Sequence, residues 1–369
     1  MIEPSRELRD ICAIVGAGHS RLGRVPGVSS LDLLVEAMHN AIVDAGVKVT
    51  DIDGIICRGP DESYAHHQQI GARLGINARF STTLDNGGAS QILGVALATM
   101  AIKAGMASTV IVGFGRDSWS RTHSSKEANV RNETRPDSLL AHEFGPEYGY
   151  FGAVAAHAFG ATRHMHLYGT TRDHFGAVAV AFREHALRNP DAQMKKPLTM
   201  AQYHESPPVV APFGMLDCSL RSDAAGAVIV TSRERARDLR QPPVSIKGFG
   251  SFNNLRGWFA DDNMVTTAAK NSGEAAYRMA GLGPDDVDTA HRTSQPIDIP
   301  NVADEVPQDP VVEATGPHFV LFQLVSAENN HLARPVLLEH GLGELAPERP
   351  RPPGEQYDLV LPVHLGPLS

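Results

Sequence analysis

Residues that could hold a metal ion or act as nucleophiles are spread thinly along this chain. His66 and His67 are adjacent and so point in different directions, and His164 and His166 lie two apart on an expected helix. Neither pair can place both rings on one metal ion. The cysteines are too few and too scattered for a disulfide framework or a zinc cluster. They are Cys12, Cys57 and Cys218.

Two further patterns would indicate a bound cofactor or ion if they were complete. Gly16-Ala17-Gly18 follows an apolar run, as in a dinucleotide-binding loop, but Arg21 stands where that loop has its third glycine. The turns near Asp53 and Asp286 lack the glutamate that closes a calcium loop. We therefore expect no metal and no cofactor.

The composition is that of a globular protein with a substantial core. The 369 residues are 42% hydrophobic and 20% charged, with a formal net charge of -9, which argues against disorder and against a nucleic-acid partner. The charged N-terminus and the interrupted apolar runs fit neither a signal peptide nor a membrane span. Together with the low cysteine content, this predicts a cytoplasmic protein that binds no membrane.

Strands and helices alternate in the elements that would position a site. Apolar positions at helical spacing predict a helix over residues 31–45, and residues 92–106 predict a helix packed on all sides. Strand, helix, strand order with short connections predicts an α/β protein with a parallel, helix-covered sheet. Strands are expected at 11–16, 51–57, 110–113 and 227–231. In the helix over residues 31–45, the positions that should face the protein core are Leu33, Leu34, Ala37, Met38, Ala41 and Ile42.

Two distant segments repeat one another without a gap. Residues 45–54, AGVKVTDIDG, align with residues 280–289, AGLGPDDVDT, and each follows an alanine-bearing helix. In both, a helix should end at glycine and a strand should begin after a short turn. This favours two duplicated halves, each with its own sheet. The alternative is that any helix-to-strand turn uses such residues.

Four groups of residues follow one another in a recognisable order in the second quarter and middle of the chain. The groups are Tyr168-Gly169-Thr170-Thr171-Arg172; Arg183-Glu184-His185-Ala186 with Asn189-Pro190; Pro197-Leu198-Thr199; and Asp217-Cys218-Ser219 with Ser222-Asp223-Ala224-Ala225-Gly226. In this order they resemble the thiolase-like group of sterol-carrier and lipid-transfer proteins. The resemblance covers about residues 10–290 and implies a thiolase-like layered α/β fold with a complete first half and a truncated or divergent second half.

The resemblance also implies where a nucleophile should stand. In that family a reactive cysteine begins the central buried helix, where free N–H groups stabilise a thiolate. The matching segment, residues 83–91, places Gly88 at the cysteine position. Ser90 is the candidate replacement, but a serine needs an oriented base, and a helix-start role is the alternative. We interpret Cys218 as a packed, inert cysteine.

A thiolase-like chain without the cysteine resembles a retro-aldolase group of the same scaffold, which cleaves the β-hydroxyacyl-CoA side chains of steroids. Tyr148-Gly149 and Phe151-Gly152-Ala153 resemble the family's loop beside the active site. Retro-aldol chemistry needs only a base and an acid, and Tyr148 and His142 are the candidates, since they are the titratable groups nearest this loop motif. The resemblance implies an acyl-CoA substrate, a homodimer and a small partner subunit of hydratase or OB-fold type. The rivals are a catalytically silent acyl-CoA-binding or scaffold subunit and a thiolase-type acyltransferase that uses serine.

The resemblance stops abruptly near Ala290. The family continues with an active-site tyrosine in a Tyr-Asp-x-Phe motif, whereas this chain reads His291-Arg292-Thr293. Twelve of the 25 prolines fall in residues 291–369, a density that breaks helices and central strands. A rebuilt C-terminus, a shifted reading frame and an unrelated short domain all remain open, and we favour the second. We expect the segment to pack poorly, apart from a small β element within 311–325.

These observations divide the chain into four parts. Residues 1–117 and 216–245 form the N-terminal thiolase-like half. Residues 118–215, rich in His, Tyr and Phe, form an insertion that should build the pocket. Residues 246–290 begin the second half, and 291–369 are the divergent proline-rich segment.

Overall fold

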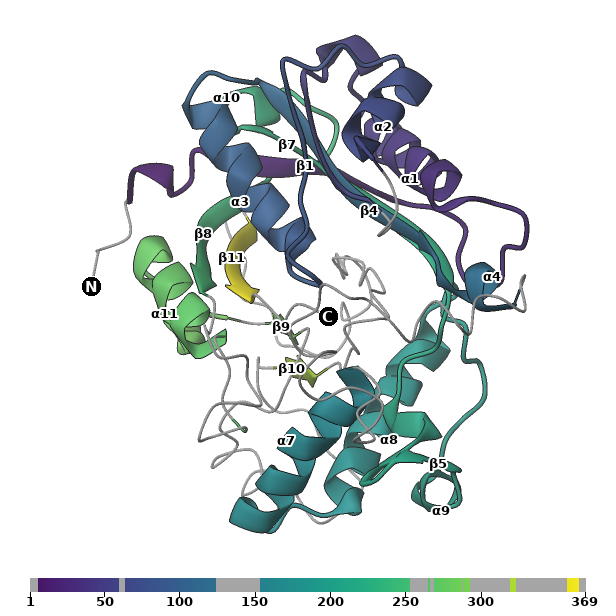
Figure 1. Cartoon of the computed structure of the whole chain (residues 1–369). Coiled ribbons are helices and arrows are strands. Elements are labelled where there is room, and N and C mark those ends of the chain that lie inside the picture. The colour runs from purple at the N-terminus through teal and green to yellow at the C-terminus, as the bar shows by residue number, and fades with distance from the viewer. Residues whose placement is uncertain are drawn as a thin grey trace.

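A seven-stranded sheet with helices on both faces forms the body of the protein, and a group of helices lies beyond one of its edges (Figure 1). The computed structural model describes residues 6–59, 64–123, 153–252, 265, 269–287, 289–292, 319–322 and 357–364. Among these residues, none of the helices is long and apolar enough to cross a membrane.

The elements alternate along the first half of the chain as expected. The strands are β1 (Cys12–His19), β2 (Gly54–Arg58), β3 (Phe80–Thr83), β4 (Thr109–Asp117), β5 (Pro208–Val210), β6 (Phe213–Gly214), β7 (Asp223–Ser232), β8 (Val244–Phe252), β9 (Thr289–Arg292), β10 (Phe319–Phe322) and β11 (Tyr357–His364). The helices are α1 (Ser30–Ala45), α2 (His66–Leu74), α3 (Ser90–Lys103), α4 (Ser118–His123), α7 (Ala153–Tyr168), α8 (Arg172–Arg188), α9 (Met200–His204), α10 (Arg233–Ala236) and α11 (Ala269–Ala280).

The sheet is mixed rather than parallel, which corrects the prediction. Its strand order is β11-β8-β1-β7-β4-β2-β3, and β2 pairs in parallel with β3 and β4. However, β7 lies between β1 and β4 and runs antiparallel to both. The reason is the insertion, because the chain leaves the sheet at the end of β4 and returns at the same edge, where Asp117 pairs with Asp223. A strand that re-enters from that edge must run back along β4.

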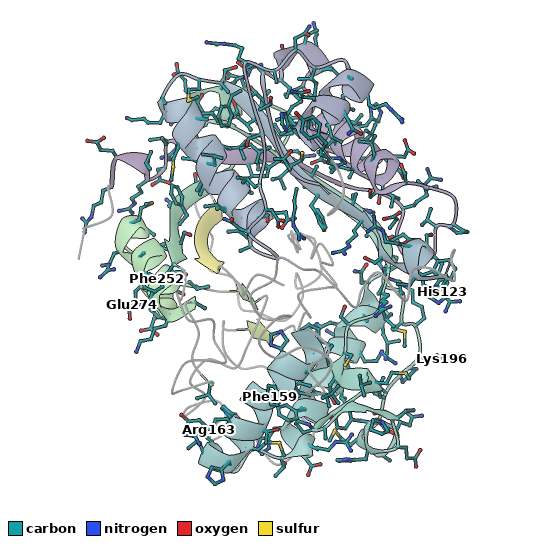
Figure 2. The ribbon with its side chains drawn as sticks, in the orientation of Figure 1. His123, Phe159, Arg163, Lys196, Phe252 and Glu274 are labelled. Atoms are coloured by element: carbon teal, nitrogen blue, oxygen red, sulfur yellow. The ribbon has the colours of Figure 1, made fainter. Side chains whose placement is uncertain are left out.

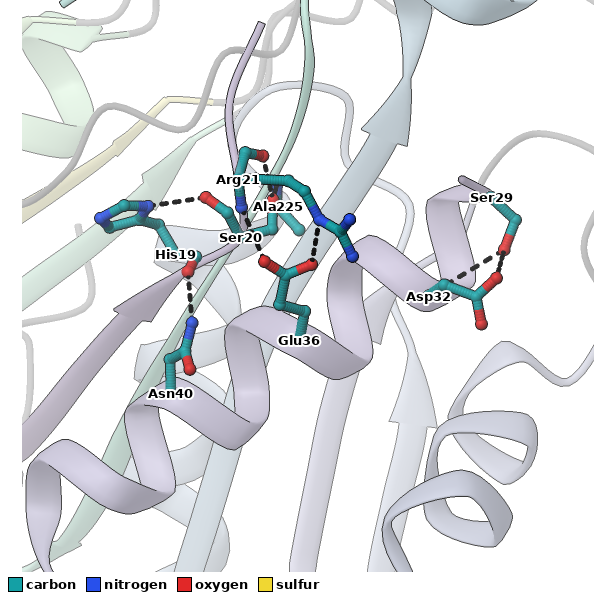
Figure 3. Close-up of polar contacts among 8 residues, drawn as sticks. All are labelled: His19, Ser20, Arg21, Ser29, Asp32, Glu36, Asn40 and Ala225. Carbon is teal, nitrogen blue, oxygen red and sulfur yellow. Dashed lines mark hydrogen bonds and ion pairs between the residues drawn. The ribbon is translucent and has the colours of Figure 1, made fainter. Parts of the chain in front are cut away.

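Helix α1 shows how the first half packs. Ser29 caps it, since its Oγ accepts a hydrogen bond from Asp32 N at 3.1 Å, and Arg21 pairs with Glu36 on the exposed side (Figure 3). All six positions predicted to face the core are at most 4% exposed. Gly16 and Gly18 of β1 face this helix, and a Cβ at Gly16 would lie 2.6 Å from the Cβ of Ala45. Close helix packing therefore accounts for the glycine pair.

Two apolar clusters cover the two faces of the sheet. One joins α1 and α2 to alternate residues of β2 and β4, such as Ile55 and Ile111. The other lies under α3 and contains the intervening residues, such as Ile56 and Val112, together with Met279 of α11. Both faces of β4 are therefore buried, as befits an inner strand of an α/β sheet.

The sequence repeat is a repeat of structure. Gly46 ends α1 with φ 68° and Gly281 follows α11 with φ 66°. In the turns that follow, Asp51 Oδ2 accepts from Lys48 N at 3.2 Å and Asp286 Oδ2 accepts from Gly283 N at 2.7 Å. The prediction that each half has its own sheet is wrong for β8, which joins the first sheet through two residue pairs with β1.

The C-terminal segment contributes described strands. β10 pairs in parallel with β9 in a small separate sheet, which confirms the β element expected within 311–325. β11 pairs in parallel with β8 from Tyr357 to His364. This pairing adds a strand to the main sheet, and the expectation that residues 291–369 pack poorly stays a prediction.

Candidate functional site

The carboxyl ends of three parallel strands meet the start of α3 at one edge of the sheet. β2 ends at Arg58, β3 at Thr83 and β4 at Asp117. Ligand sites of α/β sheets form outside the carboxyl ends of parallel strands. The helices of the insertion lie beyond this edge (Figure 1). This edge is therefore the candidate site.

The turn before α3 is held by its own side chains. Gly87 adopts φ 56°, a left-handed conformation that suits glycine, and Gly88 after it is exposed. Ser90 Oγ accepts from Asn86 N and donates to Gly87 O, both at 2.8 Å. Gly88 thus lies at the N-terminus of a buried helix, where backbone N–H groups and the helix dipole favour negative charge.

The Ser90 hydroxyl is committed to the main chain of this turn. Its side chain is 2% exposed, and no described His, Lys, Asp or Glu side chain is within hydrogen-bonding distance of its Oγ. This geometry gives no support to a serine nucleophile and agrees with a helix-start role.

The cysteines are held as thiols. Burial raises the pKa of Cys12 and of Cys57 to about 12, partly offset by hydrogen bonds from threonine side chains. Burial, and then the nearby Asp217 carboxylate, raises the pKa of Cys218. At neutral pH none of the three is a thiolate, which is the reactive form of cysteine.

An arginine that the sequence did not single out reaches this turn. Arg58 is 7% exposed, and its Nε donates to Asp85 Oδ1 at 3.0 Å. The same oxygen accepts the Gly87 N–H at 3.4 Å, and the guanidinium lies over the Phe114 ring at 5.2 Å. One signal was available, since a single charged residue ends the apolar run Gly-Ile-Ile-Cys. Its partner Asp85, 27 residues further on, could not be read from the sequence.

His66 and His67 lie near this edge without forming a metal centre. His67 Nδ1 is 2.8 Å from Thr83 Oγ1, whereas His66 is buried, and burial followed by the charge of His67 lowers its pKa. Among the described residues, no group of three His, Cys, Asp or Glu side chains could hold a metal ion.

The motifs of the insertion that carry the resemblance build its scaffold. The buried Tyr203 of α9 donates to Asp217 Oδ1 at 2.7 Å, and burial, followed by this carboxylate, raises the Tyr203 pKa. The Arg172 guanidinium lies 5.3 Å from the Tyr203 ring centre. On α7, Phe159 and Arg163 project from one side of the helix (Figure 2).

Asp223 has an equally structural role. It is fully buried, and its carboxylate accepts from Val25 N and Ser120 N at 2.9 Å each, and from Ser120 Oγ at 2.6 Å. It therefore joins β7 to the loop after β1 and to α4.

The candidate acid and base, His142 and Tyr148, lie outside the described residues, as do residues 124–152 as a whole. The structure brings Gly88 and Ser90 together at the start of α3, and the catalytic roles stay predictions.

Comparisons with known proteins agree with one another. Residues 12–211, more than half of the chain, match the family described as "Thiolase, N-terminal domain". The chain is 32% identical over 291 residues to a steroid side-chain-cleaving aldolase of Thermomonospora curvata, an alignment that covers 75% of this chain and 72% of the relative.

A second relative has a named substrate, and a solved structure has the same fold. The chain is 31% identical over 289 residues to the 17-hydroxy-3-oxo-4-pregnene-20-carboxyl-CoA lyase of Mycobacterium tuberculosis, covering 75% of this chain and 73% of the relative. The structure called Ltp2-ChsH2(DUF35) aldolase superposes with a TM-score of 0.67 and 29% identity, covering 76% of this chain and 72% of that one.

Proposed function

This chain belongs to the thiolase family, and on that premise we propose that it is a carbon–carbon lyase that cleaves a β-hydroxyacyl-CoA by a retro-aldol reaction. The start of α3 carries the proposal, because an exposed glycine, Gly88, stands where the family's reactive cysteine is expected. No cysteine lies in this turn, and the Ser90 hydroxyl is bonded to its main chain. A retro-aldol reaction suits such a site because it needs no acyl-enzyme.

The proposed reaction consists of two proton transfers and one bond cleavage. A base removes the proton of the β-hydroxyl, the Cα–Cβ bond breaks, and a ketone and the enolate of a shortened acyl-CoA form. An acid then returns a proton to the α-carbon. The CoA thioester is the substrate, and the reaction requires no further cofactor. Tyr148 and His142 are the proposed acid and base.

The relatives support the choice of substrate class. One is named for cleaving steroid side chains, and another is named a lyase of a steroid CoA thioester with a hydroxyl β to the carbonyl. The structural relative is named for two components. We therefore propose that the substrate is the CoA thioester of a steroid side chain. We also propose that the chain works with a small partner subunit of hydratase or OB-fold type.

The test is cleavage of 17-hydroxy-3-oxo-4-pregnene-20-carboxyl-CoA to a ketone and a shortened acyl-CoA, with and without the partner subunit, followed by mass spectrometry. Tyr148→Phe or His142→Gln should lower kcat by about a hundredfold to ten-thousandfold, as expected for loss of a general acid or base. Tyr168→Phe is the matched control, because Tyr168 is a half-exposed residue of α7. An unmutated protein that shows no turnover even with its partner would refute the lyase proposal.

One observation favours a second candidate, a catalytically silent acyl-CoA-binding or scaffold subunit. The chain lacks the family's Tyr-Asp-x-Phe motif after Ala290. Saturable binding of the acyl-CoA in calorimetry, without turnover in the presence of the partner, would establish that role.

We also propose a homodimer. Among the described strands of the main sheet, β3 is one of the two edge strands, and an edge strand offers main-chain groups that could pair with a second copy. Sedimentation velocity at micromolar concentration should give a dimer. A clean monomer would contradict this.

A further inference from the structure

Arg58 lies where a buried charge is difficult to explain by stability alone. It is the last residue of β2, it pairs with Phe114 of β4 across the sheet, and its side chain is 7% exposed. Burying a guanidinium costs free energy, and replacing a buried ion pair by apolar residues is often neutral or stabilising. A role in geometry would account for its presence.

The partner of Arg58 belongs to the turn of the proposed site. Arg58 Nε donates to Asp85 Oδ1 at 3.0 Å, and that oxygen also accepts the Gly87 N–H at 3.4 Å. Asp85 itself is 64% exposed and would otherwise be free to rotate in solvent. The Phe114 ring, 5.2 Å from the guanidinium carbon, limits where Arg58 can direct its donors.

The other side of the same turn is fixed by Ser90, which bonds to Asn86 N and Gly87 O. The residues ahead of Gly88 are therefore held from two directions, by Ser90 from within α3 and by Arg58 from the sheet. Backbone donors act on a reacting group only when their positions are set before the reaction.

We propose that Arg58 is a positioning residue of this site, which acts through Asp85 to fix the turn that presents the start of α3 to the acyl-CoA. This inference rests on the proposed lyase function. The proposal assigns Arg58 to positioning because its guanidinium bonds to Asp85 of the turn and lies over the Phe114 ring.

The experiment compares Arg58→Gln, Asp85→Ala and the double variant in the lyase assay. Each single variant should lower kcat on the order of tenfold to a hundredfold, as expected when a site shifts by about 1 Å, while KM changes less than about threefold. The double variant should be no slower than the slower single variant, because the two residues act as one unit. Hydrogen exchange at residues 86–91 should become faster in all three.

Arg73→Gln is the matched control. Arg73 pairs with Asp32 through Nη1 and Oδ1 at 2.8 Å, an exposed arginine–aspartate ion pair between α2 and α1 that does not involve the residues of the turn. Its kcat and the exchange at residues 86–91 should stay unchanged.

The outcomes separate this inference from the lyase proposal. An unmutated protein without turnover refutes the lyase function and this inference with it. An active unmutated protein, with Asp85→Ala within twofold of its kcat, overturns the positioning role alone. Asp85 is exposed, so this variant decides the matter even if Arg58→Gln fails to fold.

Discussion

The side chains of Ser90 and the cysteines determine which chemistry this chain can support. Ser90 Oγ has two main-chain hydrogen bonds, and the pKa values of Cys12 and Cys57 are near 12. A covalent acyl-enzyme on one of these groups would require that group to lose its proton near neutral pH. Proton transfer to and from a bound thioester requires none of them, which is why the lyase proposal suits the site.

Replacing Ser90 by alanine tests the helix-start role. Ser90→Ala leaves the Asn86 N–H without its acceptor, and we expect the free energy of unfolding to fall by about 1–2 kcal/mol in urea titrations. Ser29→Ala is the matched control, because Ser29 caps α1 far along the chain and should cost a similar amount. The unmutated protein tests the absence of an acyl-enzyme. After incubation of this protein with acyl-CoA, mass spectrometry should show no covalent modification. An adduct on Ser90 would favour the acyltransferase instead.

The buried thiols predict a pH dependence of stability. The pKa of Cys57 is about 12 in the folded protein against an ordinary value of 9.0. Between these values the unfolded chain loses a proton that the folded protein keeps, so the free energy of unfolding falls as pH rises, by up to about 1.4 kcal/mol per pH unit for each thiol. Cys57→Ala should lower this slope in urea titrations from about pH 8 to about pH 10.5. Equal slopes would contradict the assigned pKa.

At the scale of elements, the two halves use the same device to bring a helix onto a strand. Gly16 and Gly18 of β1 face α1, and Gly248 and Gly250 of β8 face α11. In each pair the missing Cβ lets the helix backbone approach the strand. The resemblance between the halves thus extends from the helix-to-strand turn back through the helix to the preceding strand.

Alanine substitutions test this shared packing. Gly18→Ala and Gly250→Ala would each drive a Cβ into the main chain of the facing helix, at Ala41 and Ser272, and should cost about 3 kcal/mol of unfolding free energy. Gly273→Ala is the control, since a Cβ there meets nothing within 4 Å and alanine favours the helix by up to about 1 kcal/mol. Thermal unfolding separates these outcomes. A Gly250→Ala protein as stable as Gly273→Ala would refute the packing argument.

The sequence predicted those elements whose signal is local. Helix α1 was predicted because its apolar positions recur at helical spacing, and the turn from Gly46 to Asp51 because its residues suit a helix end. The direction of β7 and the pairing of β8 with β1 were not predicted, because strand pairing depends on where the long insertion returns the chain. The same limit applies to the site, since Gly88 and Ser90 are local to one turn, whereas Arg58 reaches Asp85 only through the sheet.

At the scale of the whole molecule, the elements of the candidate site meet at one edge of the sheet, at the carboxyl ends of its parallel strands. β2, β3 and β4 end there, α3 begins there, and the insertion leaves and returns there. The helices α7, α8 and α9 therefore lie opposite the start of α3 (Figure 1). Insertions on an α/β scaffold commonly contribute to substrate pockets, and that role of residues 118–215 stays a prediction.

The C-terminal strand decides whether the segment after Ala290 belongs to this fold. β11 pairs with β8 over eight residues, and α11 packs against both strands. A sequence translated from a shifted reading frame would not be expected to add a strand to the sheet. We therefore expect slow hydrogen exchange in peptides from residues 357–364, comparable with that of β8, because paired strand amides exchange only when the sheet opens. Removal of residues 354–369 should lower the thermal midpoint and speed exchange in β8, while β2, which three strands separate from β8, should be affected least. Fast exchange throughout 357–364, with an unchanged midpoint after truncation, would show that the strand does not form and would favour the shifted frame.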